Sequence, residues 1–454
     1  MTEAEALARL EAAVPQNVRD VCTRLAEAGH EAVTVGGAVR DALLGRSPGD
    51  WDVATSAHPE QVLALFPRTI PTGIKHGTVT IVTGRGASSH VEVTTFRGEG
   101  AYTDARRPDH VTFGVPLVED LARRDLRVNA MAYDPAGRRL IDPFGGQRDI
   151  AERMLRAVGP TGNVYEDAVA RFTEDGLRVM RAVRFAAVLE FALDPDTERG
   201  IGPALPSLAK VSRERVSDEL RKILASRRPS LALIPAERSG ILGVILPELD
   251  AGWQTWLRWR GDRASAVAHC FARVDAAPPA ARLGALLAEL AQPDEAAVRL
   301  DRAAAKQAQD VLRRLKFSNE ELAGAAVLAG VGGACCVPAW TDGQLRRLLV
   351  DVTRPHAAAA VGLWRADGAA QLADRAAAIL ERGDPLSTAE LAVTGKDLMA
   401  ALEMAPGPAL GRLLQALFNQ VLDDPALNTR ERLLAKAQEL ELSIGRDAPP
   451  LPDG

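Results

Sequence analysis

The chain has 454 residues, of which 47% are hydrophobic and 4% aromatic, and its formal net charge is −5. This length exceeds one ordinary domain, so we expect two to four domains with sizeable cores. The acidic balance excludes a globally basic protein, and any nucleic-acid-binding surface must be a local patch.

The first 145 residues alternate between helical and strand patterns. The opening segment MTEAEALARLEAAV predicts an acidic amphipathic helix, and residues 17–29 predict a second helix that ends at Gly29. The patterns that follow predict, in chain order, a strand at 31–37, a helix at 38–45, a strand at 50–55, a helix at 59–66, two strands at 77–83 and 90–96 close enough for a hairpin, and a strand pair at 128–134 and 138–144.

Beyond Gly146 almost every segment has a helical pattern, interrupted by proline and glycine turns. The pattern predicts an α/β head, a small mixed sheet with flanking helices, followed by an elongated all-α body. The proline-rich segment 446–454 is expected to be disordered.

The cysteine pattern and the N-terminus bear on compartment. The four cysteines show no C-x-x-C spacing and no nearby histidine set, so we expect no zinc site and a reduced, cytoplasmic protein. The N-terminus lacks a signal-peptide core, and no apolar run reaches membrane-spanning length, so we expect no membrane partner.

Three carboxylates mark the strongest candidate for chemistry in the head. Asp50 and Asp52 flank Trp51, so in a strand both point to the same face. If the strand of Glu92 is its neighbour, three acidic side chains converge, as suits Mg²⁺ and a two-metal phosphoryl transfer. Gly36 and Gly37 precede them and can offer backbone N–H groups to a triphosphate. An exposed acidic strand beside a glycine turn is the alternative, and for an isolated Asp-x-Asp it is the better one.

Four stretches, in this order along the chain, resemble one family. They are VGGAVRDALLGRSPGDWDVATS (35–56), TTFRGEGAYTDARRPDHVTFG (94–114), EDLARRDLRVNAMAYD (119–134) and TEDGLRVMRAVRFAA (173–187). Together they resemble the class II tRNA nucleotidyltransferases, which are CCA-adding enzymes and bacterial poly(A) polymerases of the DNA polymerase beta superfamily. The resemblance is dense over about the first 230 residues, and the second stretch resembles the family's flexible loop.

The resemblance implies roles for individual residues. Asp50, Asp52 and Glu92 would be catalytic, with two Mg²⁺ ions held by Asp50 and Asp52. The nucleotide-binding set would be Gly36, Gly37, Arg40, Arg123, Arg124, Asp125, Asp175, Arg178, Arg181 and Arg184. For Arg123 and Arg124, cations at the C-terminus of a helix are the alternative.

The charges of 174–184 are spaced three and four apart, as on one helix face. A solvated salt-bridged face is the alternative, but apolar residues surround the row, so we expect a largely buried helix whose arginines need anionic partners. The resemblance assigns Asp175 and Arg178 to the incoming base. A carboxylate that accepts beside a guanidinium that donates complements cytosine and adenine, and it mismatches uracil and guanine.

The stretch 211–233 is the most basic in the chain and predicts an amphipathic helix. Its position after the nucleotide helix implies contact with the tRNA acceptor stem, and a solvated helix face is the alternative. The candidate RNA-binding residues are Arg213, Arg215, Arg221, Lys222, Arg227 and Arg228.

The body lacks a feature that many related chains carry, a phosphohydrolase-like segment reading roughly A-L-L-H-D-I-G-K-P. Ala288 and Glu289 stand in place of its His-Asp pair, and Gln292 replaces its lysine. A metal site needs several ligands, so we expect His269 to be structural and the hydrolase to be absent.

The resulting expectation is an enzyme that adds C and A to the 3′ end of tRNA from CTP and ATP, as a monomer or homodimer. An A-adding-only enzyme and a poly(A) polymerase are the alternatives, with a phosphohydrolase less favoured. The expected divisions are a catalytic head at 1–145, a nucleotide-selecting and neck region at 146–250, a helical body with a degenerate hydrolase-like segment at 251–385, and a tRNA-contacting tail at 386–445 before the disordered end.

Overall fold

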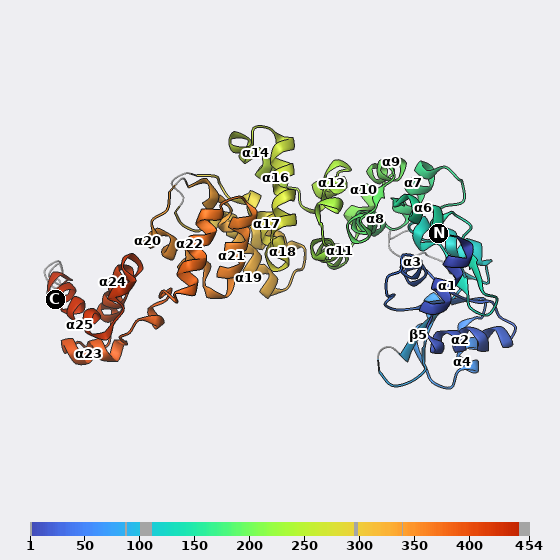
Figure 1. Cartoon of the computed structure of the whole chain (residues 1–454), viewed down its shortest axis with the longest axis horizontal. Helices are drawn as coiled ribbons and strands as arrows, with labels where there is room; N and C mark the ends of the chain where they lie inside the picture. The colour runs from blue at the N-terminus through green and yellow to red at the C-terminus, as the bar shows by residue number, and fades with distance from the viewer. Residues whose placement is uncertain (1, 87–88, 100–110, 295–297, 338, 445–454) are drawn as a thin grey trace, which may run out of the picture. The chain divides into compact units, whose positions relative to one another are not determined.

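The computed structural model describes residues 2–86, 89–99, 111–294, 298–337 and 339–444 (Figure 1). The chain forms two compact units, Met1–Pro247 and Glu248–Gly454. Each unit is described by itself. The finer division into four regions stays a prediction.

A seven-stranded mixed sheet forms the base of the first unit. Its strands follow the order β3-β4-β5-β2-β1-β8-β9. Only the β2–β5 pair is parallel among the neighbouring pairs of this sheet, and the others are antiparallel. The strands are β1 (Ala32–Val35), β2 (Asp52–Thr55), β3 (Thr69–Gly73), β4 (Thr78–Val82), β5 (His90–Thr95), β8 (Ala132–Asp134) and β9 (Arg139–Ile141).

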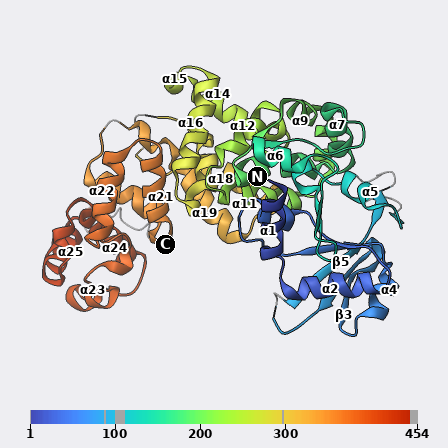
Figure 2. The ribbon, with the colours of Figure 1, turned by 45° about the vertical axis from the view of Figure 1, so that its right-hand side comes forward.

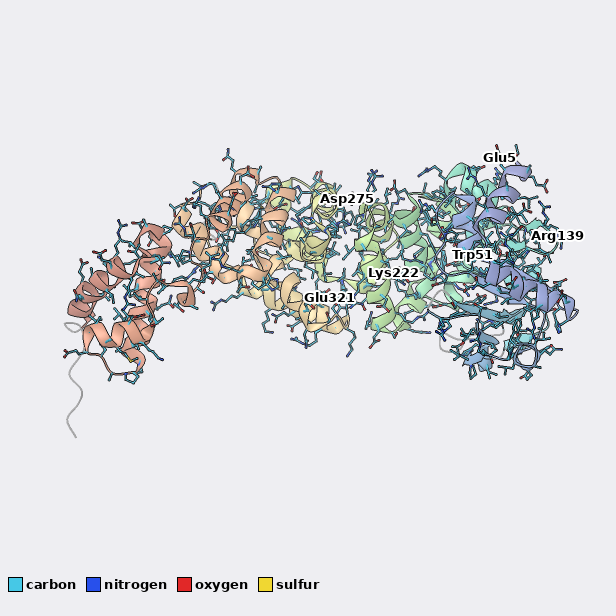
Figure 3. The ribbon with its side chains drawn as sticks, turned by 60° about the horizontal axis from the view of Figure 1, so that its bottom comes forward. Glu5, Trp51, Arg139, Lys222, Asp275 and Glu321 are labelled. Carbon is cyan, nitrogen blue, oxygen red and sulfur yellow. The ribbon has the colours of Figure 1, made fainter. Side chains whose placement is uncertain are left out.

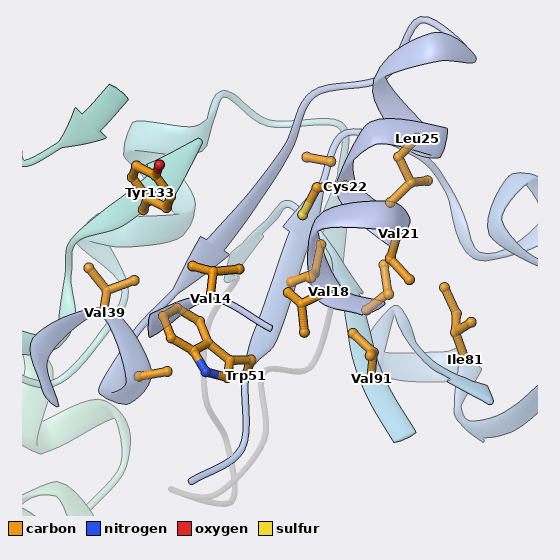
Figure 4. Packing of buried hydrophobic residues seen from close by; sticks show 14 of the residues in the cluster. Val14, Val18, Val21, Cys22, Leu25, Val39, Trp51, Ile81, Val91 and Tyr133 are labelled. Carbon is orange, nitrogen blue, oxygen red and sulfur yellow. The ribbon is translucent and has the colours of Figure 1, made fainter. Parts of the chain in front are cut away.

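Helices α1 (Glu3–Ala13), α2 (Gln16–Glu27), α3 (Gly37–Leu43) and α4 (Pro59–Leu65) accompany this sheet, and α2 and α4 lie against it (Figure 2). Their apolar side chains share one core with Trp51, which directly precedes β2 and is labelled in Figures 3 and 4. Inward-facing strand residues such as Val91 and Ile81 belong to the same core (Figure 4). Trp51 and Val53 are buried while Asp50 and Asp52 are exposed, so the predicted alternation of faces is confirmed.

The predicted elements of the head are confirmed, with shifts of a few residues at their ends. The predicted hairpin is the antiparallel pair β4–β5. The sequence did not predict β3, nor β6 (Arg97–Glu99) and β7 (Val111–Phe113), which pair with each other. Residues 100–110, which make up most of the predicted flexible loop, lie outside the described residues, as does the tail 446–454.

Beyond the sheet and the β6–β7 pair, the described residues of the first unit form helices and their connections, with the two-residue strands β10 (Met154–Leu155) and β11 (Ala192–Leu193), which pair in parallel. Its helices are α5 (Leu117–Ala122), α6 (Gly146–Glu152), α7 (Val164–Glu174), α8 (Leu177–Leu189), α9 (Pro195–Arg199), α10 (Ile201–Lys210), α11 (Arg213–Ala225), α12 (Ser230–Arg238) and α13 (Ile241–Ile245), with short 3₁₀ turns at Ile74–His76 and Arg127–Asn129.

The described part of the second unit contains helices and 3₁₀ turns and no named strand, as predicted. Its α-helices are α14 (Glu248–Thr255), α15 (Leu257–Arg260), α16 (Arg263–Ala276), α17 (Arg282–Leu287), α18 (Arg302–Arg314), α19 (Asn319–Gly330), α20 (Asp342–Val352), α21 (Arg354–Ala366), α22 (Ala370–Glu381), α23 (Gly395–Leu402), α24 (Pro408–Asp423) and α25 (Arg430–Ile444). No helix in the described ranges is long and apolar enough to cross a membrane.

Candidate active site

A cavity of about 750 Å³ in the first unit gathers most of the predicted site. From the predicted set it is lined by Gly36, Gly37, Arg40, Asp52, Arg123, Arg124, Asp125, Asp175, Arg178, Arg181 and Arg184. Seven lining residues were not assigned to a nucleotide site from the sequence: His76, Thr78, Arg97, Asn129, Leu177, Phe185 and Arg215. Asp50 and Glu92 do not line the cavity.

The predicted carboxylates meet at Asp52. In the parallel pair β2–β5, Val53 lies opposite Val93, which brings Glu92 alongside Asp52. The Asp52 side chain reaches solvent, but the surrounding protein removes much of its water, and this desolvation, with the negative charges of Glu92 and Asp50, raises its pKa to about 6. Arg124 opposes that rise. Asp52 therefore sits among acidic neighbours where a cation would relieve the repulsion.

The glycine turn before α3 lines the cavity, and one of its two N–H groups already has a partner. The Gly36 N–H donates to the Met131 carbonyl at 3.2 Å, so this group is not available to a phosphate. Gly36 has φ +79°, and a Cβ there would lie 2.8 Å from Nη1 of Arg124. The position requires glycine because the backbone turns in the left-handed region directly against an arginine of the pocket.

Two buried aspartates hold the arginines beside this turn. Asp120 accepts from Arg123 at 2.8 Å and lies 3.6 Å from Arg124. Asp125 accepts from Arg181 at 2.6 Å and from the Asn129 amide at 2.9 Å. Burial would raise the pKa of Asp125, but the charge of Arg181 and the Asn129 hydrogen bond hold it well below its usual range. Arg123 directly follows the end of α5, the helix C-terminal position named as its alternative.

The predicted continuous helix through Asp175 is wrong. Helix α7 ends at Glu174, Asp175 is extended with φ −129° and ψ 104°, and α8 starts at Leu177. The break occurs where Gly176 passes α10, because a Cβ at Gly176 would lie 2.3 Å from backbone atoms of Ser207 and Leu208. Asp175 then caps α8 by accepting the Leu177 N–H at 3.0 Å.

Asp175 and Arg178 nevertheless both face the cavity, each with a charged partner. Asp175 pairs with Arg215 of α11 at 2.9 Å, and Arg178, which is 9% exposed, pairs with Glu174 at 2.7 Å. Arg184 pairs with Glu219 at 2.5 Å. The prediction that a buried arginine row needs anionic partners is confirmed.

Arg215, predicted to bind RNA, lines the cavity and binds Asp175, so its RNA-binding role stays a prediction. Its sequence neighbours gave no sign of this partner, which is 40 positions away. The other predicted RNA-binding residues lie on or near α11, where Lys222 is labelled in Figure 3. Three of them have acidic partners: Arg221 with Asp218, Lys222 with Glu219, and Arg227 with Glu190.

In the second unit, His269 belongs to a buried ion-pair network. Its Nε2 lies 2.5 Å from Asp367, which also binds Arg273 at 3.1 Å, and Arg273 reaches Glu289 at 2.5 Å. Glu289 is 1% exposed and neutralised by Arg273. Within the described ranges no three His, Cys, Asp or Glu side chains are arranged to hold a metal ion. These contacts support a structural role for His269.

A mixed sheet that sets two neighbouring carboxylates beside an arginine-lined cavity defines a nucleotidyltransferase head. The comparisons agree: family models match for the poly(A) polymerase head domain at residues 32–156, the probable RNA- and SrmB-binding site of polymerase A at 190–252, and the putative tRNA nucleotidyltransferase domain 2 at 297–437. The chain is 39% identical to a CCA-adding enzyme of Geobacillus thermodenitrificans, covering 93% of this chain and 96% of that one. The chain belongs to the CCA-adding enzyme family of tRNA nucleotidyltransferases.

Other relatives have the same extent. A CCA-adding enzyme of Lactococcus lactis is 34% identical over 93% of this chain and 96% of its own length. The crystal structure of the Bacillus stearothermophilus CCA-adding enzyme in complex with CTP matches with a TM-score of 0.66 and 33% identity, covering 95% of this chain and 99% of that one. The Thermotoga maritima CCA-adding enzyme complexed with tRNA matches at TM-score 0.58 and 17% identity over 96% of this chain and 98% of that one, which supports the fold.

Proposed function

We propose that this protein adds C and A to the 3′ end of tRNA from CTP and ATP, choosing each nucleotide without a nucleic-acid template. One observation carries the proposal: a single cavity is lined by Asp175 and Arg178 and also by Asp52 and several arginines. A nucleotide needs both kinds of group, one to bind its base and one to bind its triphosphate. Family membership agrees with this reading, and the relative solved with CTP shows that a protein of this fold binds one of the two nucleotides.

The choice of base follows from the chemistry of two side chains. Cytosine and adenine both present an amino donor beside a ring-nitrogen acceptor. The carboxylate of Asp175 accepts, and the guanidinium of Arg178 donates. Uracil and guanine present a carbonyl and a ring N–H at these places, so both contacts would be mismatched. Arg215 holds Asp175 by an ion pair of 2.9 Å, and Glu174 holds Arg178 by an ion pair of 2.7 Å.

The family is a metal-dependent one, and the donor set near Asp52 fits two Mg²⁺ ions held by Asp50 and Asp52. The fit rests on geometry: Asp50 and Asp52 are exposed on either side of the buried Trp51, and the β2–β5 register brings Glu92 alongside Asp52. Because no group of three protein donors is arranged for an ion in the described residues, triphosphate oxygens would complete the coordination. Bound Mg²⁺ would activate the tRNA 3′-hydroxyl and stabilise the leaving pyrophosphate.

The chain's own residues orient the reaction. Arg40, Arg123, Arg124, Arg181 and Arg184 line the same cavity as Asp52 and bind the triphosphate, while Asp125 holds Arg181 in place. Glu92 stands beside Asp52 on the neighbouring strand and keeps the site acidic. Positioning and charge stabilisation of this kind supply most of the rate in phosphoryl transfer.

The other end of the substrate is the tRNA. We place its acceptor stem near Arg213, Arg221, Lys222, Arg227 and Arg228, which are basic side chains on or near α11. Duplex RNA would be bound there by its shape and phosphates. The tail at 386–445 provides a further contact surface. The free cysteines support a cytoplasmic setting.

Two sibling activities are the alternatives, A addition alone and poly(A) synthesis. A phosphohydrolase is not supported, because Glu289 is neutralised by Arg273 and Ala288 offers no donor. The test uses tRNA transcripts that end before CCA, after C and after CC, each with one labelled nucleotide. A CCA-adding enzyme extends the first two with CTP and the third with ATP. Extension of the third alone identifies an A-adding enzyme, and long A tails identify a poly(A) polymerase.

A further inference from the structure

Three arginines of the cavity converge on one aromatic ring. The guanidinium carbons lie 4.0 Å (Arg184), 5.0 Å (Arg40) and 5.5 Å (Arg181) from the centroid of Phe185. All three distances fall within the range of a cation–π interaction. Phe185 is 6% exposed and lines the cavity, so these contacts form in a site that is shielded from bulk water.

The arginines come from two separate elements, α3 for Arg40 and α8 for the other two. Like charges placed this close repel: burial lowers the pKa of Arg184, and the charge of Arg181 lowers it further. Other side chains must therefore hold the three arginines together before a substrate binds.

Arg40 is held along two edges, because its Nε and Nη2 bind Asp41 at 2.9 and 2.8 Å and its Nη1 donates to the Asn129 amide oxygen. Arg181 and Arg184 are each held at one edge, by Asp125 and Glu219. A planar group fixed at one edge can still tilt about that contact. A ring against its face removes the tilt, and it adds no negative charge that would repel a phosphate.

We propose that Phe185 is a positioning residue for the triphosphate, which fixes the planes of Arg181 and Arg184 and packs them beside Arg40 in the cavity. The inference rests on the proposed nucleotidyl transfer and adds a residue that touches neither base nor reacting atoms. The role of Phe185 is thus distinct from that of Asp175 and Arg178, which bind the base in the proposed function.

The test compares binding of CTP and CMP to the full chain by calorimetry. Phe185→Leu should weaken CTP binding by roughly 5- to 30-fold, since three contacts of modest strength are lost. CMP lacks two of the three phosphates, so its affinity should change less than about twofold. The matched control is Phe191→Leu: Phe191 is also buried and stacks under one arginine, Arg153 at 5.4 Å, but it does not line the cavity. This control should leave both affinities unchanged.

Kinetics give the second readout. KM for CTP and ATP should rise by a common factor in Phe185→Leu, while discrimination against UTP and GTP stays at the wild-type level. Unchanged CTP affinity, or equal losses for CTP and CMP, would overturn the proposal. If the leucine variant does not fold, pentafluorophenylalanine at position 185 keeps the shape and reverses the ring's charge distribution. Wild-type CTP affinity in that protein would also overturn it. Absence of tRNA extension by the wild type would instead refute the proposed function, and the binding comparison would still decide the role of Phe185.

Discussion

We predict opposite kinetic effects for substitutions of Asp175 and Arg181, although both residues line the same cavity. Asp175→Ala should relax discrimination against UTP and GTP more than it weakens triphosphate binding, because it removes the acceptor for the amino group of C or A. A lost base contact of this kind costs roughly 1–3 kcal/mol of discrimination. Arg181→Ala should raise KM for CTP and ATP alike and leave discrimination unchanged. Steady-state kinetics with four nucleotides decide it, and proportional losses in both variants would show that these ion pairs are structural.

Asp50 and Asp52 should be needed for chemistry and not for RNA binding. Asp50→Ala or Asp52→Ala is expected to abolish incorporation of both CTP and ATP, since loss of metal-assisted activation costs several kcal/mol of barrier. The affinity for tRNA should stay close to that of the wild type. The measurement pairs single-turnover extension with a filter-binding assay. Turnover near the wild-type rate in either variant would refute the site assignment.

The raised pKa of Asp52, about 6, also predicts a pH effect on stability. The folded protein binds this proton more tightly than the unfolded chain, so Asp52 costs stability as the pH rises from about 4 through 6. Asp52→Asn without added metal should therefore raise the melting temperature at pH 8, by about 1–3 °C given the solvent access of this group, and leave it unchanged at pH 4. A gain that is equal at both pH values would point to packing instead of charge.

Single residues could be predicted from the sequence where the motif is local. Asp52 follows from the Asp-x-Asp spacing and its strand alternation, and Asp175 with Arg178 from the motif they share. Arg215 could not be placed, because its partner Asp175 lies on a different element and nothing in the basic run around it marks one arginine as inward.

At the level of elements, the break between α7 and α8 determines where Asp175, the proposed base-binding carboxylate, lies in the cavity. It puts Asp175 in extended backbone, from which one carboxylate oxygen caps α8 and the other meets Arg215. The sequence predicted one helix there because the charge spacing is helical. The cause of the break is Gly176 against α10, a contact some 30 positions away that no local pattern encodes. Strand β3 was missed for a related reason: its side chains are largely exposed, so it shows no apolar alternation.

Gly176→Ala is the matching test. The added methyl group would overlap the backbone at Ser207. The free energy of unfolding should therefore fall by about 1–3 kcal/mol, the usual cost of overpacking. CTP binding should weaken as well, since Asp175 must move with its neighbour. Gly202→Ala on α10 is the control: a Cβ there meets nothing within 4 Å, and alanine favours a helix by up to about 1 kcal/mol. Thermal and denaturant unfolding of both variants should give changes of opposite sign. If Gly176→Ala leaves the free energy of unfolding unchanged, α10 shifts to accommodate the methyl group at little cost.

At the scale of the whole molecule, the sequence predicted an α/β head and a helical remainder, and both are confirmed. The order of strand and helix patterns along the chain indicated this division, because strand patterns end near Gly146. The boundary between the two compact units, Pro247 to Glu248, lies within an all-helical stretch, where periodicity continues on both sides. Only the packing of side chains far apart in sequence separates the units.

The cavity belongs to the first unit alone. Every residue that lines the cavity lies before Pro247, and each ion pair described for that cavity is made within the same unit. A fragment of residues 1–247 should therefore fold with one cooperative transition and bind CTP within about threefold of the full chain, since no contact of the cavity is lost. Its KM for tRNA should rise at least about tenfold if the tail at 386–445 provides the proposed phosphate contacts, although the basic residues near α11 remain in the fragment. Calorimetry with CTP and extension of a transcript ending before CCA measure the two quantities. A fragment that folds but loses CTP would show that the second unit shapes the cavity, and one that extends tRNA as well as the full chain would show that residues 248–454 add nothing to RNA binding.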